Sequence, residues 1–109
     1  MGIYSKNNST AAVNYGIIES SKYGAIGMFA ENGTIQNDGT IILSGDKSIG
    51  MAGRNNATII NDGQITMNGK SGIGMYVTNN SHVYNNGVIT INGDNGTGIQ
   101  IGANSTLEN

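Results

Sequence analysis

The chain contains no cysteine, no proline and no tryptophan among its 109 residues, and only 11% of its residues are charged. The absence of cysteine excludes both a disulfide framework and a thiolate metal site. Five basic residues and a formal net charge of −2 leave no cationic surface for nucleic acid. No apolar run approaches the ~20 residues that a membrane-spanning helix needs, so we expect no direct membrane insertion of this chain.

Glycine is abundant instead, with 18 residues, and asparagine is nearly as frequent. Ordinary soluble domains carry about 25% charged residues. The surface of this protein must therefore be built largely from Asn, Ser, Thr and Gly. High polarity with low charge can indicate disorder, but the regular placement of Ile, Val, Leu and Met argues against disorder here.

The whole sequence is one repeated unit, best preserved over residues 72–93. When the sequence is shifted back by one unit, Met75 aligns with Met51, and a second shift aligns Met51 with Met28. Residues 73–77, 82–85 and 88–91 show the period-2 alternation of half-buried strands. Asn-Gly, Asp-Gly and Asn-Asn pairs separate these stretches and mark turns. No ten-residue window lacks such turn residues, so we expect no helix.

Three strands per repeat without a helix predict an all-β fold, a right-handed parallel β-helix (β-solenoid). It has about 4.5 coils of 23–24 residues, with three short strands in each coil. The leucine-rich repeat is the main alternative at this period and is disfavoured because it normally needs a helix or 3₁₀ segment. We expect residues 1–109 to be a single β-helix fragment of a longer repeat protein.

Stacking of the coils turns aligned positions into columns, of which three are apolar and predicted to fill the core. These columns are Ile3, Met28, Met51, Met75 and Ile99; Ile18, Ile41, Ile65 and Ile89; and Ala12, Ile35, Ile59, Val83 and Leu107. An asparagine column is predicted to face inward at a bend and to bond along the axis: Asn14, Asn37, Asn61, Asn85 and Asn109.

A second invariant column consists of glycine: Gly2, Gly27, Gly50, Gly74 and Gly98. We expect these glycines where two backbones approach so closely that a Cβ would clash. A phosphate-binding loop is the alternative, but it needs a strand-to-helix turn and a nearby lysine, which are absent.

The acidic residues are scattered over turns and do not form a catalytic group. Asp38 and Asp62 stack on adjacent coils, but calcium prefers six or more oxygen ligands. Asp46, Lys70 and Asp94 share a column of alternating sign, which predicts a weak ladder of surface ion pairs. Glycan cleavage needs paired carboxylates on one face. We therefore expect no enzyme activity, no catalytic residue, no cofactor and no metal.

Outward-facing aromatic residues are the better candidates for binding. Tyr4, Phe29 and Tyr76 share one column, interrupted by Ala52 and Gln100. Exposed rings on a weakly charged surface can stack on sugars or anchor a protein partner. The alternative is that they are simply favourable strand residues.

Two further candidates lie on the next strand of the unit. Tyr84 is expected to point outward beside the single histidine, His82, which we interpret as a solvent-facing residue rather than a base or ligand. The candidate partner-binding surface is therefore Tyr4, Phe29, Tyr76, Tyr84 and His82.

The repeat resembles the passenger repeats of fusobacterial-type (type V) autotransporter adhesins. The resemblance rests on the pairing of residues 74–77 with 85–93, and of residues 27–30 with 37–41. It implies a right-handed β-helical stalk on the outside of the cell, used in cell adhesion and virulence. It also implies anchoring in the outer membrane through a region outside this chain, and it transfers no catalytic motif.

These observations predict a structural and adhesive segment of a bacterial cell-surface protein, a stiff stalk that presents binding surfaces. The expected partners are a host or bacterial surface protein or a glycan. A different class of function is a self-assembling subunit that forms filaments by end-to-end stacking of coils, because exposed strand edges invite pairing. A third is an accessory segment of a polysaccharide depolymerase.

Overall fold

The computed structural model describes residues 2–7 and 11–108, and all regular structure in this part of the chain is β-strand. Asn109, the last member of the asparagine column, lies outside the described residues. In chain order the strands are β1 (Ile3–Lys6), β2 (Ala12–Asn14), β3 (Ile17–Ser20), β4 (Ile26–Glu31), β5 (Thr34–Asn37), β6 (Thr40–Leu43), β7 (Ile49–Arg54), β8 (Thr58–Asn61), β9 (Gln64–Met67), β10 (Ile73–Thr78), β11 (His82–Asn85), β12 (Val88–Ile91), β13 (Thr97–Ile101) and β14 (Thr106–Glu108).

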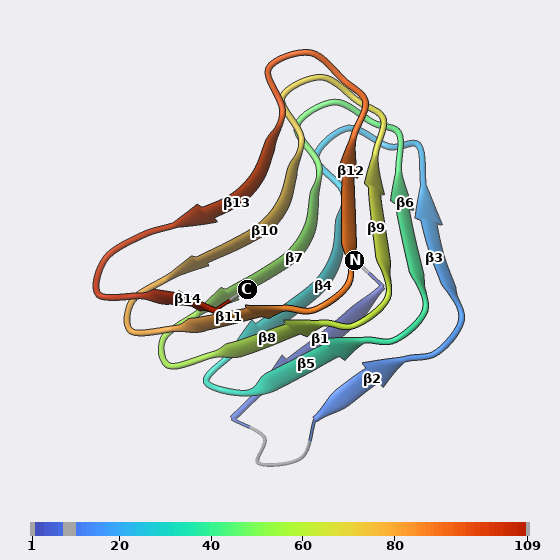
Figure 1. The fold of residues 1–109 in the computed structure, drawn as a ribbon. Helices are drawn as coiled ribbons and strands as arrows, with labels where there is room; N and C mark the ends of the chain where they lie inside the picture. Colours follow the sequence, from blue (N-terminus) through green and yellow to red (C-terminus); the bar gives the residue numbers. More distant parts are fainter. Residues whose placement is uncertain (1, 8–10, 109) are drawn as a thin grey trace.

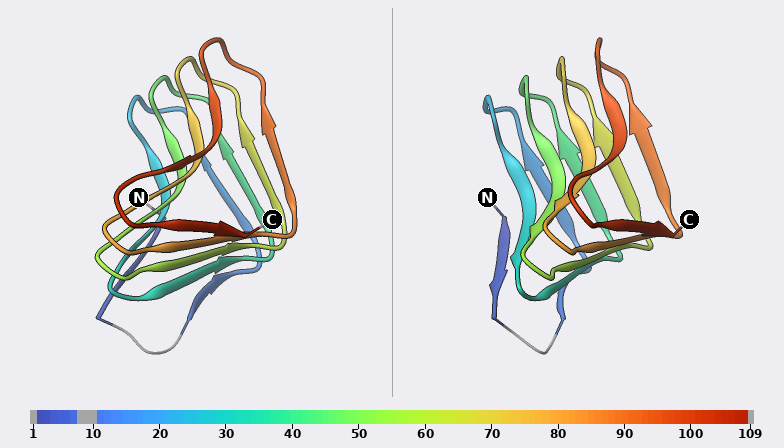
Figure 2. Two further views of the ribbon diagram at one scale, coloured as in Figure 1. Left: turned by 60° about the vertical axis from the view of Figure 1, so that its left-hand side comes forward. Right: turned by 90° about the vertical axis from the view of Figure 1, so that its left-hand side faces the viewer.

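Each coil gives one strand to each of three parallel sheets. The sheets have the orders β1-β4-β7-β10-β13, β14-β11-β8-β5-β2 and β12-β9-β6-β3. In Figure 1 the chain runs anticlockwise from blue to red while it advances toward the viewer, and Figure 2 shows the same advance from the side. The fold is therefore a right-handed parallel β-helix of about four turns, as predicted.

The strand register confirms the predicted columns. Met28 pairs with Met51 and Met51 with Met75, so each methionine lies beside its counterpart in the next repeat. The same register holds in the other two sheets, where Ile35 pairs with Ile59 and Ile41 with Ile65. Equivalent residues of successive repeats therefore lie directly above one another.

The apolar columns form one continuous core. Its fully buried larger side chains are Met28, Ile35, Ile41, Leu43, Met51, Ile59, Ile65, Met67, Met75, Val77 and Val83. Burial of each contributes about 1.5–3 kcal/mol, which offsets the entropy of ordering a glycine-rich backbone. Leu107 was predicted to belong to this core, but it is 44% exposed because β14 is the end strand of its sheet.

The asparagine column forms a buried ladder of amide hydrogen bonds. Nδ2 of Asn14 donates to Oδ1 of Asn37, and the same bond joins Asn37 to Asn61 and Asn61 to Asn85, each at 3.0 Å. Asn37 also donates to the carbonyl oxygen of Gly39 at 3.3 Å. The inward orientation and axial bonding predicted for this column are confirmed for its described members.

The glycine column lies where neighbouring coils touch. A Cβ added to Gly27 would lie 2.6 Å from the carbonyl oxygen of Gly50 and 2.9 Å from Cγ2 of Ile41. At Gly50 the corresponding distance to the carbonyl oxygen of Gly74 is 2.5 Å. Because no side chain fits in this space, the predicted close backbone approach is confirmed for Gly27 and Gly50, whereas a Cβ at Gly98 of the same column would meet no heavy atom within 4 Å.

Candidate partner-binding face

The aromatic residues predicted to face outward do so on the sheet of β1, β4, β7, β10 and β13. Tyr4 pairs with Phe29, Phe29 with Ala52, Ala52 with Tyr76, and Tyr76 with Gln100. We call this column of five residues the aromatic row. Its neighbours along the strands, such as Met28 and Met75, are fully buried, so alternation directs the row outward.

Two members of the aromatic row are in direct contact. The rings of Tyr4 and Phe29 lie nearly parallel, at an interplanar angle of 5° and a centroid distance of 5.4 Å. This is the offset stacked geometry that aromatic pairs prefer. Adjacent coils can therefore carry stacked rings on this face, and the small Ala52 interrupts the row before Tyr76.

The interruption at Ala52 leaves a shallow notch in the sheet surface, with a volume of about 380 Å³. Its walls include Phe29 and Tyr76 from the coils on either side, and Arg54 lines it with its guanidinium over the Phe29 ring. The lining residues are Ile26, Phe29, Ile49, Ala52, Gly53, Arg54, Tyr76 and Thr78. Ala52 itself is only 4% exposed, so the walls rather than the floor are available for contact.

A second column on the same face lies two residues further along each strand. Lys6 pairs with Glu31, Glu31 with Arg54, and Arg54 with Thr78. We call these four residues the polar row. Two residues of strand span about 6.6 Å, so the face carries an aromatic row and a polar row side by side.

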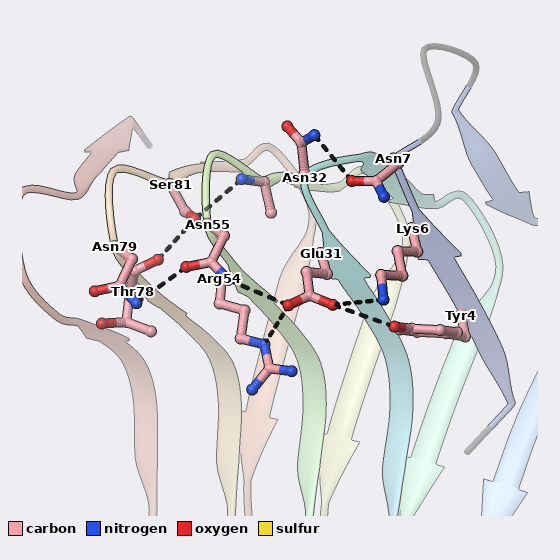
Figure 3. A network of polar contacts seen from close by, with 11 residues as sticks. Tyr4, Lys6, Asn7, Glu31, Asn32, Arg54, Asn55, Thr78, Asn79 and Ser81 are labelled. Carbon is pink, nitrogen blue, oxygen red and sulfur yellow. Dashed lines mark hydrogen bonds and ion pairs between the residues drawn. The ribbon is translucent and has the colours of Figure 1, made fainter.

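Glu31 is the centre of the polar row (Figure 3). Its carboxylate accepts hydrogen bonds from Nε of Arg54 at 3.1 Å and from Nδ2 of Asn55 at 3.2 Å. Nζ of Lys6 lies 3.8 Å from the other oxygen, which also accepts a 3.4 Å hydrogen bond from the hydroxyl of Tyr4. The network joins three coils at the C-terminal ends of strands β1, β4 and β7.

The charge environment shifts the acidity of Glu31. Burial acts to raise the pKa of its carboxyl, but the positive charges of Arg54 and Lys6 and the hydrogen bonds from Asn55 and Arg54 together lower that pKa below the ordinary value of 4.5. The carboxylate is therefore held ionised between its two cations.

This shift predicts a pH dependence of stability. A carboxyl group whose pKa is lower in the folded state stabilises the fold fully above pH 4.5, and this contribution is lost as the pH falls through the folded pKa. We therefore expect Glu31→Gln to lower the melting temperature at neutral pH, with the difference from the wild type shrinking as the pH falls below 4.5. Thermal unfolding followed by circular dichroism at several pH values measures this.

Glu19→Gln is the matched control for this experiment, since it removes one negative charge at an exposed strand position of a different sheet. The Glu19→Gln difference from the wild type is expected to stay small at every pH. A Glu31→Gln difference that is the same at acidic and neutral pH would contradict the proposed ion-pair effect.

The remaining predicted candidates lie elsewhere. His82 and Tyr84 point outward on β11, which belongs to a different sheet from the aromatic row. Nδ1 of His82 is hydrogen-bonded to Oγ1 of Thr106 on the next coil. The structure thus brings Tyr4 and Phe29 into contact and places Tyr76 across the notch, but it does not bring His82 and Tyr84 to this face.

The acidic turn residues are used differently from the prediction. Oδ1 of Asp46 accepts a 2.9 Å hydrogen bond from the backbone N–H of Lys70, and the predicted ladder of ion pairs through Asp46 and Lys70 is not formed. The ladder does not form because the Asp46 carboxylate lies beside the N–H of a turn, which needs a hydrogen-bond acceptor. The ion pairs in the described part of the chain join Glu31 to Lys6 and to Arg54.

The stacked carboxylates of Asp38 and Asp62 are occupied by side-chain amides. Nε2 of Gln36 donates to both, at 2.8 and 3.3 Å, and Nδ2 of Asn86 donates to Asp62 at 3.1 Å. Within residues 2–7 and 11–108, no three His, Cys, Asp or Glu residues are grouped in a way that could hold a metal ion. The same residues include no helix long and apolar enough to cross a membrane.

Fold and surface together define the class of this protein: a β-solenoid scaffold that carries side chains in columns on its outer faces. The chain belongs to the family described as the BigA third pectate lyase-like domain, which matches residues 1–109. This is a domain of bacterial surface proteins, in keeping with a location at the cell surface. Comparison with curated proteins and with solved structures gave no match.

Proposed function

We propose that this chain is a segment of a stiff stalk in the passenger of an autotransporter adhesin. The stalk holds the aromatic row and the polar row away from the outer membrane, where a host cell or another bacterium can contact them. The observation that carries this proposal is the outward face of the β1-β4-β7-β10-β13 sheet, on which aromatic and polar side chains stand in neighbouring columns.

The stalk role is supported by the way in which adjacent coils are joined. Backbone hydrogen bonds link each coil to the next at strands and corners alike, for example Gly63 N–H to the Asn37 carbonyl at 2.8 Å and Gly87 N–H to the Asn61 carbonyl at 2.9 Å. The core columns and the asparagine ladder run in the same direction. A rod built this way resists bending while its surface residues vary between coils.

A non-enzymatic role is part of the same proposal, although the family name likens the domain to pectate lyases. The support comes from the acidic side chains: Glu31 is paired with cations, and Asp38, Asp46 and Asp62 accept hydrogen bonds at turns. General acid–base chemistry on a glycosidic bond needs two carboxyl groups on either side of the substrate. Of the four residues in the polar row, Glu31 is the one that carries a carboxyl group, so the row itself does not supply a pair of carboxyl groups.

The adhesive role can be tested with beads coated with the purified chain. We expect coated beads to adhere to epithelial or bacterial cells more than albumin-coated beads do. The triple variant Tyr4→Ser, Phe29→Ser, Tyr76→Ser should lose this adhesion, because it removes the rings of the aromatic row. Tyr15→Ser, which changes a tyrosine that is 78% exposed outside the row, is the matched control and should retain it.

Beads that adhere no better than albumin-coated beads would contradict the adhesive role. Equal adhesion of the triple variant and the wild type would show that another surface mediates contact. Circular dichroism of each variant establishes that the β-structure is retained before adhesion is compared.

A second candidate function is end-to-end assembly, favoured by the match between the two ends of the rod. Ile99 on β13 and Ile3 on β1 belong to the same apolar column, as do Ile89 on β12 and Ile18 on β3. Within the described part of the chain, the end strands of each sheet have unpaired edges, which are able to pair with another copy. Light scattering that rises with protein concentration, with filaments visible by electron microscopy, would support this candidate, whereas a stable monomer would contradict it.

A further inference from the structure

The notch between Phe29 and Tyr76 combines an apolar wall with a polar edge. The wall consists of the two aromatic rings together with Ile26 and Ile49 at the start of the strands. The edge consists of Arg54 and Thr78 of the polar row, about 6.6 Å further along the strands. A volume of about 380 Å³ lies at the lower end of the range for small-molecule sites, which is about 300–1,000 Å³.

Arg54 has hydrogen-bonding capacity left over at this edge. Its guanidinium lies over the ring of Phe29, with Cζ 5.3 Å from the ring centroid, and its side chain is 51% exposed. Nε is bonded to Glu31, while Nη1 and Nη2 have no hydrogen-bond partner among the described residues (Figure 3). Two N–H-bearing nitrogens of a planar fork are thus available to a ligand in the notch.

The charges around the notch do not favour an anionic ligand. Arg54, the cation that lines the notch, is already paired with Glu31 at 3.1 Å, and Lys6 lies on β1 on the other side of Glu31 and is not among the lining residues. The chain as a whole carries a net charge of −2. A ligand that uses hydroxyl groups rather than a carboxylate therefore fits this edge best.

From these three observations we propose that the notch binds one neutral hexopyranose ring. The apolar C–H face of the sugar packs against Tyr76 and the neighbouring wall, and its hydroxyl groups accept hydrogen bonds from the terminal nitrogens of Arg54. The proposal deepens the proposed adhesive function, on which it rests, by naming a glycan as the partner of this face. A single shallow site of this kind binds in the millimolar range, and repeated contacts along an array of stalks supply avidity.

The test is a titration of the ¹⁵N-labelled chain with methyl β-D-glucopyranoside and methyl β-D-galactopyranoside, followed by two-dimensional NMR. We expect saturable shifts at the backbone amides of Gly53, Arg54, Tyr76 and Thr78 with at least one of the two glycosides. Ala52→Tyr should weaken binding by about tenfold or more, because a ring at the interruption fills the notch. Tyr15→Ser, a change at an exposed tyrosine outside the candidate surface, should leave binding unchanged.

Tyr76→Ser provides a second test that does not depend on filling the notch, and it should also weaken binding by about tenfold. Sodium glucuronate and N-acetyltyrosine amide serve as competing probes. The proposal is overturned if neither glycoside gives a saturable shift, if glucuronate binds more tightly than the glucoside, or if only the tyrosine derivative binds. The last result would identify a protein partner for this face.

The bead experiment separates this proposal from the adhesive function itself. Adhesion that depends on the aromatic row but is not inhibited by either glycoside would overturn the sugar site and leave the adhesive function standing. Saturable glycoside binding without adhesion of the coated beads would support the sugar site and overturn the adhesive function.

Discussion

Replacing Gly50 with alanine is expected to destabilise the protein by about 3 kcal/mol. The new Cβ would lie 2.5 Å from the carbonyl oxygen of Gly74 and 2.8 Å from Cγ2 of Ile65. The carbonyl belongs to the backbone of the next coil, and the Ile65 side chain is fully buried, so neither can move aside without disturbing the stack. The free energy of unfolding, measured by urea denaturation, tests this expectation.

Gly98 provides a control within the same column. A Cβ at Gly98 would meet no heavy atom within 4 Å. Gly98→Ala is therefore expected to change the free energy of unfolding by no more than about 0.5 kcal/mol, or to raise it slightly because alanine reduces the entropy of the unfolded chain. Equal losses for the two substitutions would show that the glycines are required for a reason other than contact between coils.

The second large effect is expected at Asn61, in the middle of the buried asparagine ladder. Asn61→Ala removes the acceptor of the Asn37 amide and the donor to the Asn85 amide, both at 3.0 Å, in a side chain that is fully buried. Each of these two lost hydrogen bonds contributes about 0.5–1.5 kcal/mol, and truncation of the side chain also leaves space in the packed bend. We expect a loss of about 3 kcal/mol in the free energy of unfolding.

Asn68 is the matched control for the ladder because it makes similar bonds on the surface. It donates to Oγ of Ser44 at 3.3 Å and accepts from Nδ2 of Asn92 at 2.8 Å, and it is exposed. Water can replace these bonds, so Asn68→Ala should cost no more than about 0.5 kcal/mol. If Asn68→Ala and Asn61→Ala cost the same, burial of the ladder is not the source of its contribution.

The glycine and asparagine columns show how much of this fold the sequence alone could predict. In a parallel β-helix each residue contacts its counterpart in the next coil, so the repeat period of the sequence is also the register of the sheets. The repeat that aligns Met51 with Met75 was therefore sufficient to predict their pairing. The same reasoning correctly predicted the outward direction of the aromatic row.

The candidate site was predicted less completely, because it depends on side-chain conformation across coils. Lys6, Glu31 and Arg54 alternate in charge along one column, and this was a usable signal that was missed in favour of Asp46 and Lys70. Stacking of the Tyr4 ring on Phe29 and the notch over Ala52 depend on rotamers. A repeat period specifies which residues are neighbours but not which way their side chains turn.

Two buried serines show a further limit of prediction from the repeat. Oγ of Ser48 donates to the carbonyl of Gly45 at 2.9 Å and accepts the backbone N–H of Ala25 at 3.2 Å. Oγ of Ser81 makes the corresponding bonds to Thr78 and Ala57, at 2.8 and 3.1 Å. Serine is common in turns, so nothing in its position distinguishes these two, which bridge coils at corners, from serines that only face solvent.

The pairing of each strand only with its counterparts in the two neighbouring coils has a consequence for how such a protein changes over generations. A stretch of gene that encodes one complete turn can be deleted or duplicated in frame, and the new junction reproduces contacts that already existed. Recombination between the similar DNA segments of successive turns therefore produces stalks of different length. Selection can then change the distance between the cell and its target without changing the side chains on the surface.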